Sequence, residues 1–257
     1  MVVEKVKRYI QENELMGDCT TVVVGFSGGA DSMALLDILI QLGYRCVAAH
    51  CNFHLRGEES DRDARFAQQW CKERSIQFEI VDFDTVGYAD SHKISIEMAA
   101  RDLRYGWFEE LRQKYDSDAI AVAHHKDDSV ETMLLNLSRG TGISGLRGIL
   151  PKNGYVVRPL LALSREEIEQ YLNRKDIPYR TDSTNKEDIY RRNYIRLNII
   201  PALRKLNPSV SEALFRTSKN LAEVEKIYRN AIDASIAKVL NDSRIDINLL
   251  MKEVSPQ

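Results

Sequence analysis

Short apolar runs rich in β-branched residues alternate with longer amphipathic segments along the first half of the chain. A run of about four to eight such residues predicts a buried strand, whereas apolar residues with a period of about 3.6 predict a helix. The expected strands are residues 21–26, 45–50, 77–83 and 119–123, and the expected helices between them are residues 32–42, 60–74 and 95–115. This alternation favours an α/β fold, in which a parallel sheet lies between two layers of helices.

The pattern becomes less regular after the fourth expected strand. An apolar segment at residues 155–161 is expected to add a strand, although its Pro159 favours a strand end or an edge position. Beyond Ile200 and Pro201 the pattern predicts one or two amphipathic helices, and Asn207-Pro208-Ser209 is typical of a helix start. The last residues begin another element, so we expect the sequence to stop inside a further region.

Composition argues against several classes of protein. Hydrophobic residues make up 44% and charged residues 29% of the 257 residues, which indicates a packed core rather than disorder. Every apolar run is shorter than the roughly 18 residues that span a bilayer. The charged, amphipathic N-terminus is unlike a signal peptide. We therefore expect a cytoplasmic protein with no membrane partner.

The four cysteines are Cys19, Cys46, Cys51 and Cys71, and none of them forms a C-x-x-C pair. This spacing argues against a zinc ribbon, an iron–sulfur cluster and a paired redox thiol. We expect all four to be reduced thiols with a structural role, because free cysteine behaves as a small apolar side chain.

The small net charge of −2 hides an asymmetry along the chain. Residues 139–229 contain 18 Lys and Arg against 10 Asp and Glu, a balance of +8, and the remainder of the chain is correspondingly acidic. A basic segment of this size favours a polyanionic partner. The alternative is a solvated helical surface, which the sequence alone does not exclude.

The clearest chemical motif is the segment from Ser27 to Ser32, which joins the first expected strand to the first expected helix. Free N–H groups and a positive dipole at a helix start bind anions, and glycines let the backbone approach them closely. The segment lacks the lysine of a Walker A loop and the spacing of G-x-G-x-x-G. An ordinary glycine-rich turn is the alternative reading. The candidate phosphate-binding residues are Ser27, Gly28, Gly29, Ala30, Asp31 and Ser32.

A second cluster follows the fourth expected strand, where His124 and His125 precede three acids. These acids are Asp127, Asp128 and Glu131, and on a helix they share one face. Carboxylates beside a polyphosphate predict a Mg²⁺ site. The alternative is that Asp127 or Asp128 caps the helix. We expect both to hold in part, with one acid at the cap and another toward the metal.

The order Ser27-Gly28-Gly29-x-Asp31-Ser32 resembles the signature of the PP-loop (N-type) ATP pyrophosphatases, whose loop binds the pyrophosphate part of ATP. Residues 121–142, "AVAHHKDDSVETMLLNLSRGTG", resemble a pattern of the tRNA(Ile)-lysidine synthase family. Further segments that resemble the same family are residues 50–66, 97–105, 158–168 and 182–201. The resemblance covers about residues 20–220. Phe53 stands where the family usually has a histidine, and Ser129 replaces its usual glutamine.

The resemblance implies a ligase that uses ATP to join free L-lysine to C2 of the wobble cytidine in the CAU anticodon of tRNA(Ile). An adenylated tRNA is the implied intermediate, and AMP and pyrophosphate are the products. ATP and Mg²⁺ are the implied cofactors, and the sequence does not choose between a monomer and a homodimer. The implied catalytic residues are Asp31, Asp127, Asp128, Glu131, Arg192 and Arg196, with Asp127 and Asp128 as metal ligands.

The resemblance also implies a domain division. Residues 1–205 are expected to form a PP-loop ATP pyrophosphatase catalytic domain. Residues 206–257 are expected to form a helical linker and the start of a truncated C-terminal tRNA-binding region. Arg101 and Arg104 are further candidates for orienting ATP or tRNA, with structural ion pairs as the alternative.

Three other functions compete with this reading. A tRNA thiolase of the same superfamily commonly uses paired cysteines, which this chain lacks. An amide-forming ligase such as an NAD or GMP synthetase does not need the basic segment at residues 139–229. A non-catalytic nucleotide-binding module does not need the acids Asp127, Asp128 and Glu131. A pyrophosphate-release assay with lysine and tRNA separates these functions.

Overall fold

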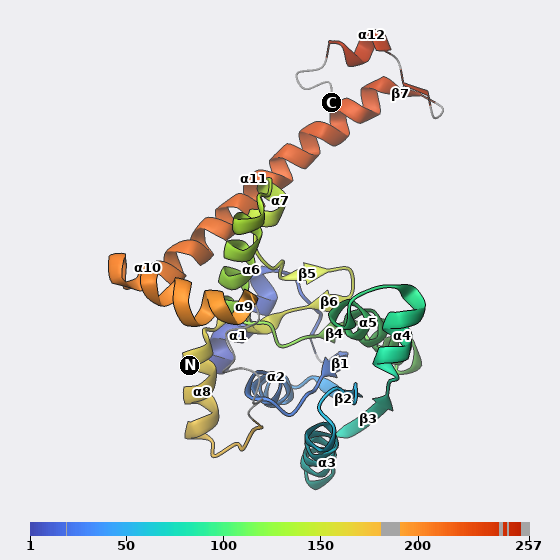
Figure 1. The fold of residues 1–257 in the computed structure, drawn as a ribbon, viewed down its shortest axis with the longest axis vertical. Helices are drawn as coiled ribbons and strands as arrows, with labels where there is room; N and C mark the ends of the chain where they lie inside the picture. The colour runs from blue at the N-terminus through green and yellow to red at the C-terminus, as the bar shows by residue number, and fades with distance from the viewer. Residues whose placement is uncertain (19, 181–190, 242–243, 246, 253–257) are drawn as a thin grey trace. The chain divides into compact units, whose positions relative to one another are not determined.

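The computed structural model describes residues 1–18, 20–180, 191–241, 244–245 and 247–252 (Figure 1). Cys19 and residues 182–190 of the family-like segment lie outside the described residues. The chain divides into two compact units, residues 1–129 with 150–193 and residues 130–149 with 194–257. These units interleave along the sequence, whereas the sequence predicts consecutive domains 1–205 and 206–257; that boundary stays a prediction.

A six-stranded sheet organises the first unit, in the order β3-β2-β1-β4-β6-β5. All neighbouring strands are parallel except β5 and β6, which pair antiparallel. The strands are β1 (Thr21–Gly25), β2 (Arg45–Asn52), β3 (Gln77–Asp82), β4 (Ala119–Ala121), β5 (Lys152–Asn153) and β6 (Val156–Val157). The four strands expected in the first half are confirmed. Strands β1, β2 and β4 are largely buried, and a sheet covered on both faces requires such continuous apolar runs.

Helices cover both faces of this sheet, as the sequence predicts. Figure 1 shows α2 and α3 on one side of the strands and α4 and α5 on the other. On the α5 side, Phe108 and Leu111 pack against Val23 and Ile120 of the sheet. The helices of this unit are α1 (Val2–Glu12), α2 (Ala30–Gln41), α3 (Glu58–Glu73), α4 (Thr85–His92), α5 (Ile96–Lys114) and α8 (Arg165–Arg174).

The expected strand at residues 155–161 is shorter in the structure. The β6 strand ends at Val157, and Pro159 begins a 3-10 turn, η1 (Pro159–Ala162). Proline has no N–H to give to a neighbouring strand, and its fixed φ suits the first position of a helical turn. The expected strand end at Pro159 is confirmed, whereas an edge position is wrong because β6 lies between β4 and β5.

The second unit is helical. Helix α6 (Lys126–Arg139) begins in the first unit and continues into the second, which also contains α7 (Ile143–Leu146), α10 (Ile200–Leu206), α11 (Val210–Val239) and α12 (Ile247–Leu250). The short helix α9 (Arg191–Tyr194) runs into a π-helical turn, Ile195–Ile199, which precedes α10. Val130, Ile195 and Ile200 form a buried apolar cluster in this second unit. Helix α11 begins directly after Ser209, as the sequence predicts.

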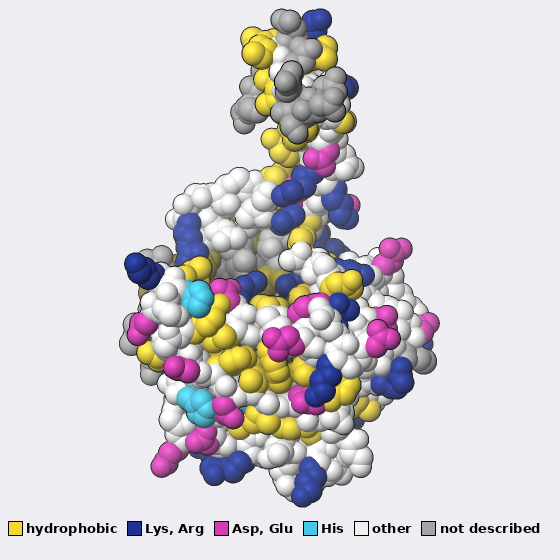
Figure 2. Space-filling view, turned by 90° about the vertical axis from the view of Figure 1, so that its right-hand side faces the viewer, with side chains coloured by type: hydrophobic (Ala, Val, Ile, Leu, Met, Phe, Trp, Pro, Cys, Tyr) yellow, Lys and Arg dark blue, Asp and Glu magenta, His cyan; other side chains and the backbone are white. Residues whose placement is uncertain are grey.

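The surface of α11 carries both basic and apolar side chains. Ile227 and Tyr228 are exposed, and so are Arg216 and Lys219. Figure 2 shows blue and yellow side chains next to each other near the top of the view, where α11 lies. Among the described residues, every helix is too short or too polar to cross a lipid bilayer.

Candidate active site

The loop from Phe26 to Gly29 closes around the hydroxyl of Ser32. Ser32 Oγ accepts hydrogen bonds from Ser27 N at 3.2 Å and from Gly28 N at 3.1 Å, and it donates to Gly29 O at 3.0 Å. Ser32 is buried, so this hydroxyl organises the loop from inside. On the sequence alone, both serines are candidate phosphate-binding residues. In the structure the Ser32 proton is directed to Gly29 O, whereas Ser27 Oγ lies 3.2 Å from Ser32 Oγ at the cavity wall.

Gly28 has a backbone conformation that favours glycine. Its φ is +82°, and a Cβ at this position would lie 3.1 Å from Phe66 Cδ1. The carbonyl of Gly28 accepts a hydrogen bond from Arg180 N at 2.9 Å, so a distant segment holds the loop in place. The glycine is therefore required by both backbone torsion and close packing.

The first turn of α2 supplies unpaired backbone donors. Ala30, Asp31 and Ser32 hold the first three positions of the helix, whose N–H groups have no acceptor within the helix. No side chain caps this helix at Gly29. A helix start with free N–H groups and a positive dipole end is suited to an anion.

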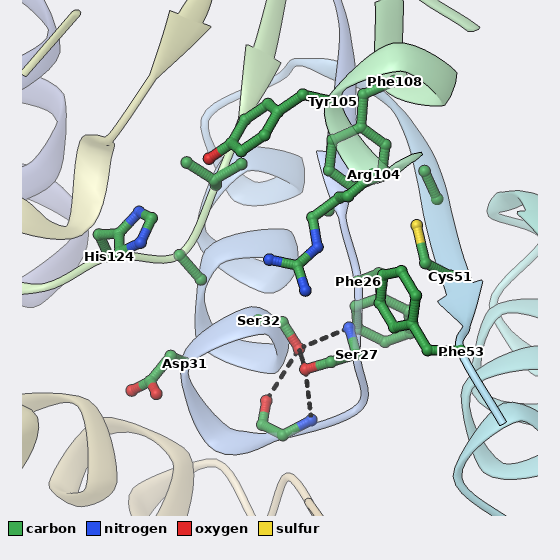
Figure 3. A pocket seen from close by; sticks show the side chains of 15 residues that line it. Phe26, Ser27, Asp31, Ser32, Cys51, Phe53, Arg104, Tyr105, Phe108 and His124 are labelled. Atoms are coloured by element: carbon green, nitrogen blue, oxygen red, sulfur yellow. Dashed lines mark hydrogen bonds between the residues drawn. The ribbon is translucent and has the colours of Figure 1, made fainter. Parts of the chain in front are cut away.

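A cavity of about 320 Å³ opens over this loop (Figure 3). The loop forms one wall through Ser27, Gly29 and Asp31, and the side chains of Arg104 and His124 face it. The apolar part of the wall comes from Phe26, Cys51, Phe53, Tyr105 and Phe108. The cavity thus combines a wall suited to an anion with an apolar region.

Two groups in the wall are held in their neutral forms. Burial lowers the pKa of His124 to about 4, and nearby Asp128 only partly opposes this shift. Burial also raises the pKa of the Cys51 thiol to about 12. At neutral pH the cavity wall therefore presents an uncharged imidazole and an uncharged thiol. The expected reduced state of the cysteines is consistent with Cys46, Cys51 and Cys71, which are free thiols.

Asp31 is bound by a residue that the sequence analysis missed. Arg165 Nη1 donates to Asp31 Oδ2 at 2.6 Å, and His125 Nε2 lies 3.8 Å from Asp31 Oδ1. Burial raises the pKa of Asp31 above its ordinary value, and His125 and Arg165 oppose the shift. Asp31 Oδ1 is buried and has no hydrogen-bond partner among the described residues. This oxygen is available to a cation or a donor that binds in the cavity.

Asp127, Asp128 and Glu131 all lie on α6, and we name them the α6 acids. Backbone N–H groups anchor the first two. Asp127 Oδ2 accepts from Arg165 N at 2.7 Å, and Asp128 Oδ2 accepts from His125 N at 2.9 Å. Asp128 Oδ1 also accepts from Arg192 Nη2 at 3.1 Å. Burial alone would raise the pKa of Asp128, but His125 and Arg192 hold it below its ordinary value. Asp128 therefore stays ionised and supports the start of α6.

The third α6 acid, Glu131, lies in the second unit and is paired there with Arg196. Arg196 Nε donates to Glu131 Oε1 at 2.6 Å, and Arg196 Nη2 donates to Oε2 at 3.0 Å. This two-bond geometry is the strong form of an arginine–carboxylate pair. Glu131 is 1% exposed, so the pair fixes helix α6 to the segment after α9.

The predicted Mg²⁺ ligands are only partly suited to a metal. Among the described residues, no group of three or more His, Cys, Asp or Glu side chains is arranged as a metal site. Mg²⁺ needs few protein ligands when phosphate oxygens complete its shell. Among the described residues, Asp31 Oδ1 has no hydrogen-bond partner, whereas both oxygens of Asp128 already accept hydrogen bonds.

Sequence reasoning missed Arg165 because its segment "SREE" is typical of a helix start. The structure confirms that start: Ser164 and Glu167 form a capping box. Nothing local signals the bond to Asp31, which lies 134 residues earlier. His124 also lines the cavity, although the sequence analysis does not count it among the candidate site residues.

Comparison with known proteins places this geometry in a family. A family model described as a PP-loop domain matches residues 2–203. A tRNA(Ile)-lysidine synthase from Bacteroides thetaiotaomicron is 51% identical over 257 residues, which is 100% of this chain and 60% of that protein. The enzyme of the same name from Bacillus subtilis is 36% identical over 255 residues, covering 95% of this chain and 54% of that protein.

Solved structures support the fold independently. A U34-tRNA thiolase from Methanococcus maripaludis, determined with its 4Fe-4S cluster, aligns with a TM-score of 0.68 at 19% identity. The alignment covers 86% of this chain and 78% of that chain. At this identity the likeness concerns the fold alone. The curated relatives are longer than this chain, which spans between half and two thirds of their length. The family match over residues 2–203, together with the loop around Ser32, shows that the chain belongs to the PP-loop family.

Proposed function

We propose that this chain carries the catalytic part of a tRNA(Ile)-lysidine synthase. The reaction joins free L-lysine to C2 of the wobble cytidine in the CAU anticodon and consumes ATP. Similarity over the whole chain to proteins of that name supports the proposal. The observation that carries it is the cavity lined by the loop from Ser27 to Ser32, where the buried Asp31 Oδ1 has no hydrogen-bond partner among the described residues.

The proposed chemistry has two steps. The C2 carbonyl oxygen of cytidine attacks the α-phosphorus of ATP, and the bond to the leaving pyrophosphate breaks. The lysine amine then attacks C2, loses a proton, and the bond from C2 to the AMP oxygen breaks. Both steps develop negative charge on phosphate oxygens, which oriented N–H groups and cations stabilise.

The described residues suit the first step through binding and orientation. The free N–H groups of Ala30, Asp31 and Ser32 hold the pyrophosphate part of ATP. We infer that the apolar wall around Phe108 accepts the adenine ring, and that Arg104, which faces the loop at Ser27, contacts the phosphates. A Mg²⁺ ion on Asp31 and Asp127 would supply charge neutralisation for the same oxygens when bound.

The second step needs a carboxylate for the lysine ammonium, since a free cation otherwise loses its hydration without compensation. The α6 acids are the proposed groups. Asp128 and Glu131 are each held by an arginine, Arg192 and Arg196, and this fixes the positions of both carboxylates. Hydrogen bonds of this kind keep reacting groups in a productive geometry.

A lysine-incorporation assay tests the function. The chain is incubated with ATP, radiolabelled lysine and either tRNA(Ile) with a CAU anticodon or the same tRNA with a GAU anticodon. The expected result is label in the CAU tRNA only, together with one pyrophosphate released per lysine joined. Transfer of sulfur or ammonia to tRNA, with no lysine joined, would refute the proposal and leave a thiolase or an amide ligase.

A further inference from the structure

Arg104 is a cation in the cavity wall without an acidic partner. Among the described residues, no carboxylate forms an ion pair with it, in contrast to Arg165 and Arg192, which are bound to Asp31 and Asp128. Its guanidinium reaches from α5 into the cavity toward the loop at Ser27 (Figure 3). A positive charge left uncompensated at an anion-binding wall is available to an incoming phosphate.

The contact that orients Arg104 is aromatic. Arg104 Cζ lies 5.2 Å from the centroid of the Phe53 ring, within the range of a cation–π interaction. A planar guanidinium stacks on an aromatic face without losing its hydrogen-bond donors, so these stay free for a ligand. Phe53 therefore fixes the direction of the Arg104 guanidinium without neutralising its charge. A carboxylate in the same place would neutralise it.

Phe53 is itself held firmly. Its carbonyl accepts a hydrogen bond from the buried hydroxyl of Thr85 at 3.1 Å, and its ring stacks on Phe83 at 5.7 Å between centroids. Asn52, just before it, is buried and bridges Asp61 and His54 N. These contacts fix the short segment that follows β2 at the edge of the cavity. A ring held in this way is a rigid platform.

We propose that Phe53 is a positioning residue, which acts through Arg104 to aim the guanidinium at the phosphates of ATP bound on the loop. This inference rests on the proposed function for the identity of the nucleotide. An aromatic ring without a titratable proton keeps the contact with Arg104 independent of pH near neutrality.

The test is a double-mutant cycle on ATP affinity, measured by titration calorimetry without tRNA or lysine. Phe53→Leu removes the aromatic face and retains apolar bulk, Phe53→Tyr retains the face, and Arg104→Met removes the charge. A cation–π contact corresponds to about a two- to thirtyfold change in affinity. We expect Phe53→Leu to weaken ATP binding within that range, and Phe53→Tyr to stay within about twofold of the unsubstituted chain.

The decisive comparison is Phe53→Leu in the Arg104→Met background, where it is expected to change ATP affinity by less than about twofold. A Phe53→Leu effect that persists undiminished without Arg104 would overturn the proposal, as would an affinity unaffected by Phe53→Leu. Thermal melts confirm that each variant folds. Steady-state assays add a further criterion: KM for ATP rises in Phe53→Leu more than kcat falls.

The inference and the proposed function fail separately. If the cycle shows coupling but lysine is never joined to tRNA, the positioning role stands and the lysidine reaction is wrong. If lysine is joined but Phe53 and Arg104 act independently, the reaction stands and the positioning role is wrong. A chain that binds no ATP refutes both.

Discussion

Substitution of Gly28 by alanine tests the anion loop with a magnitude that follows from its geometry. At φ +82° a Cβ costs about 1–2 kcal/mol, because it approaches the following carbonyl. The contact with Phe66 Cδ1 at 3.1 Å requires that ring to move by a few tenths of an ångström. We expect the apparent Tm to fall by about 2–4 °C for each kcal/mol. Because Gly28 N and O both bind within the site, we expect ATP affinity to fall by at least about tenfold.

Gly43 provides a matched control. Its φ is +88°, it follows the end of α2, and a Cβ there would meet nothing within 4 Å. Gly43→Ala therefore carries similar backbone strain without touching the cavity, and we expect a similar loss of Tm with unchanged ATP affinity. Melting curves and calorimetric titrations with ATP measure the two effects in both variants. If both variants bind ATP equally well, the loop around Ser32 does not hold the phosphates, and the reasoning is refuted.

Three further predictions concern charge. Asp31→Asn is expected to leave the fold intact and to make ATP affinity less dependent on Mg²⁺. Titration with and without the ion measures this, and an unchanged Mg²⁺ dependence would show that Asp31 is not a metal ligand. Neutral variants of the α6 acids are assayed separately for adenylated tRNA and for lysine-modified tRNA. We expect one variant to accumulate adenylated tRNA, which identifies the lysine-binding acid. If every variant loses both products equally, no α6 acid acts in the lysine step alone. Because Arg192 and Arg196 are paired with acids, the exposed Arg216 and Lys219 of α11 are the better test of tRNA binding. Their joint replacement by alanine is expected to reduce the slope of log affinity against log salt by about 2, and an unchanged slope identifies α11 as a solvated surface.

The central strands β1, β2 and β4 could be predicted because they are largely buried. Strand β1 shows this most clearly: Val22, Val23 and Val24 are all buried, so the sequence reads as an unbroken apolar run. Helix α4 was not expected. Its eight residues contain Gly87 and lack a repeating apolar face, and its start depends on Asp84, whose side chain accepts from Gly87 N at 2.9 Å. A helix made by a cap and tertiary packing leaves little periodic signal.

The sequence predicted the residue types of the site, but it did not predict which side chains contact each other. Spacing on a helix placed the α6 acids on one face, which needs only local geometry. Which arginine binds which acid depends on contacts across more than 60 residues, such as Arg192 with Asp128 and Arg196 with Glu131. The role of Ser32 was also hidden, since a hydroxyl that closes a loop and one that binds a phosphate have the same sequence.

The pairing of charges around the cavity separates two kinds of ligand. Arg165 already compensates Asp31 in part, but Asp31 Oδ1 has no hydrogen-bond partner among the described residues, so this acid still attracts a cation. Arg104 has an aromatic platform in place of a carboxylate, so it still attracts an anion. ATP with its metal ion brings both charges at once. When the nucleotide binds, its metal ion can compensate the charge of Asp31 and its phosphates can compensate the charge of Arg104. The same contacts that bind ATP would then also orient its α-phosphate.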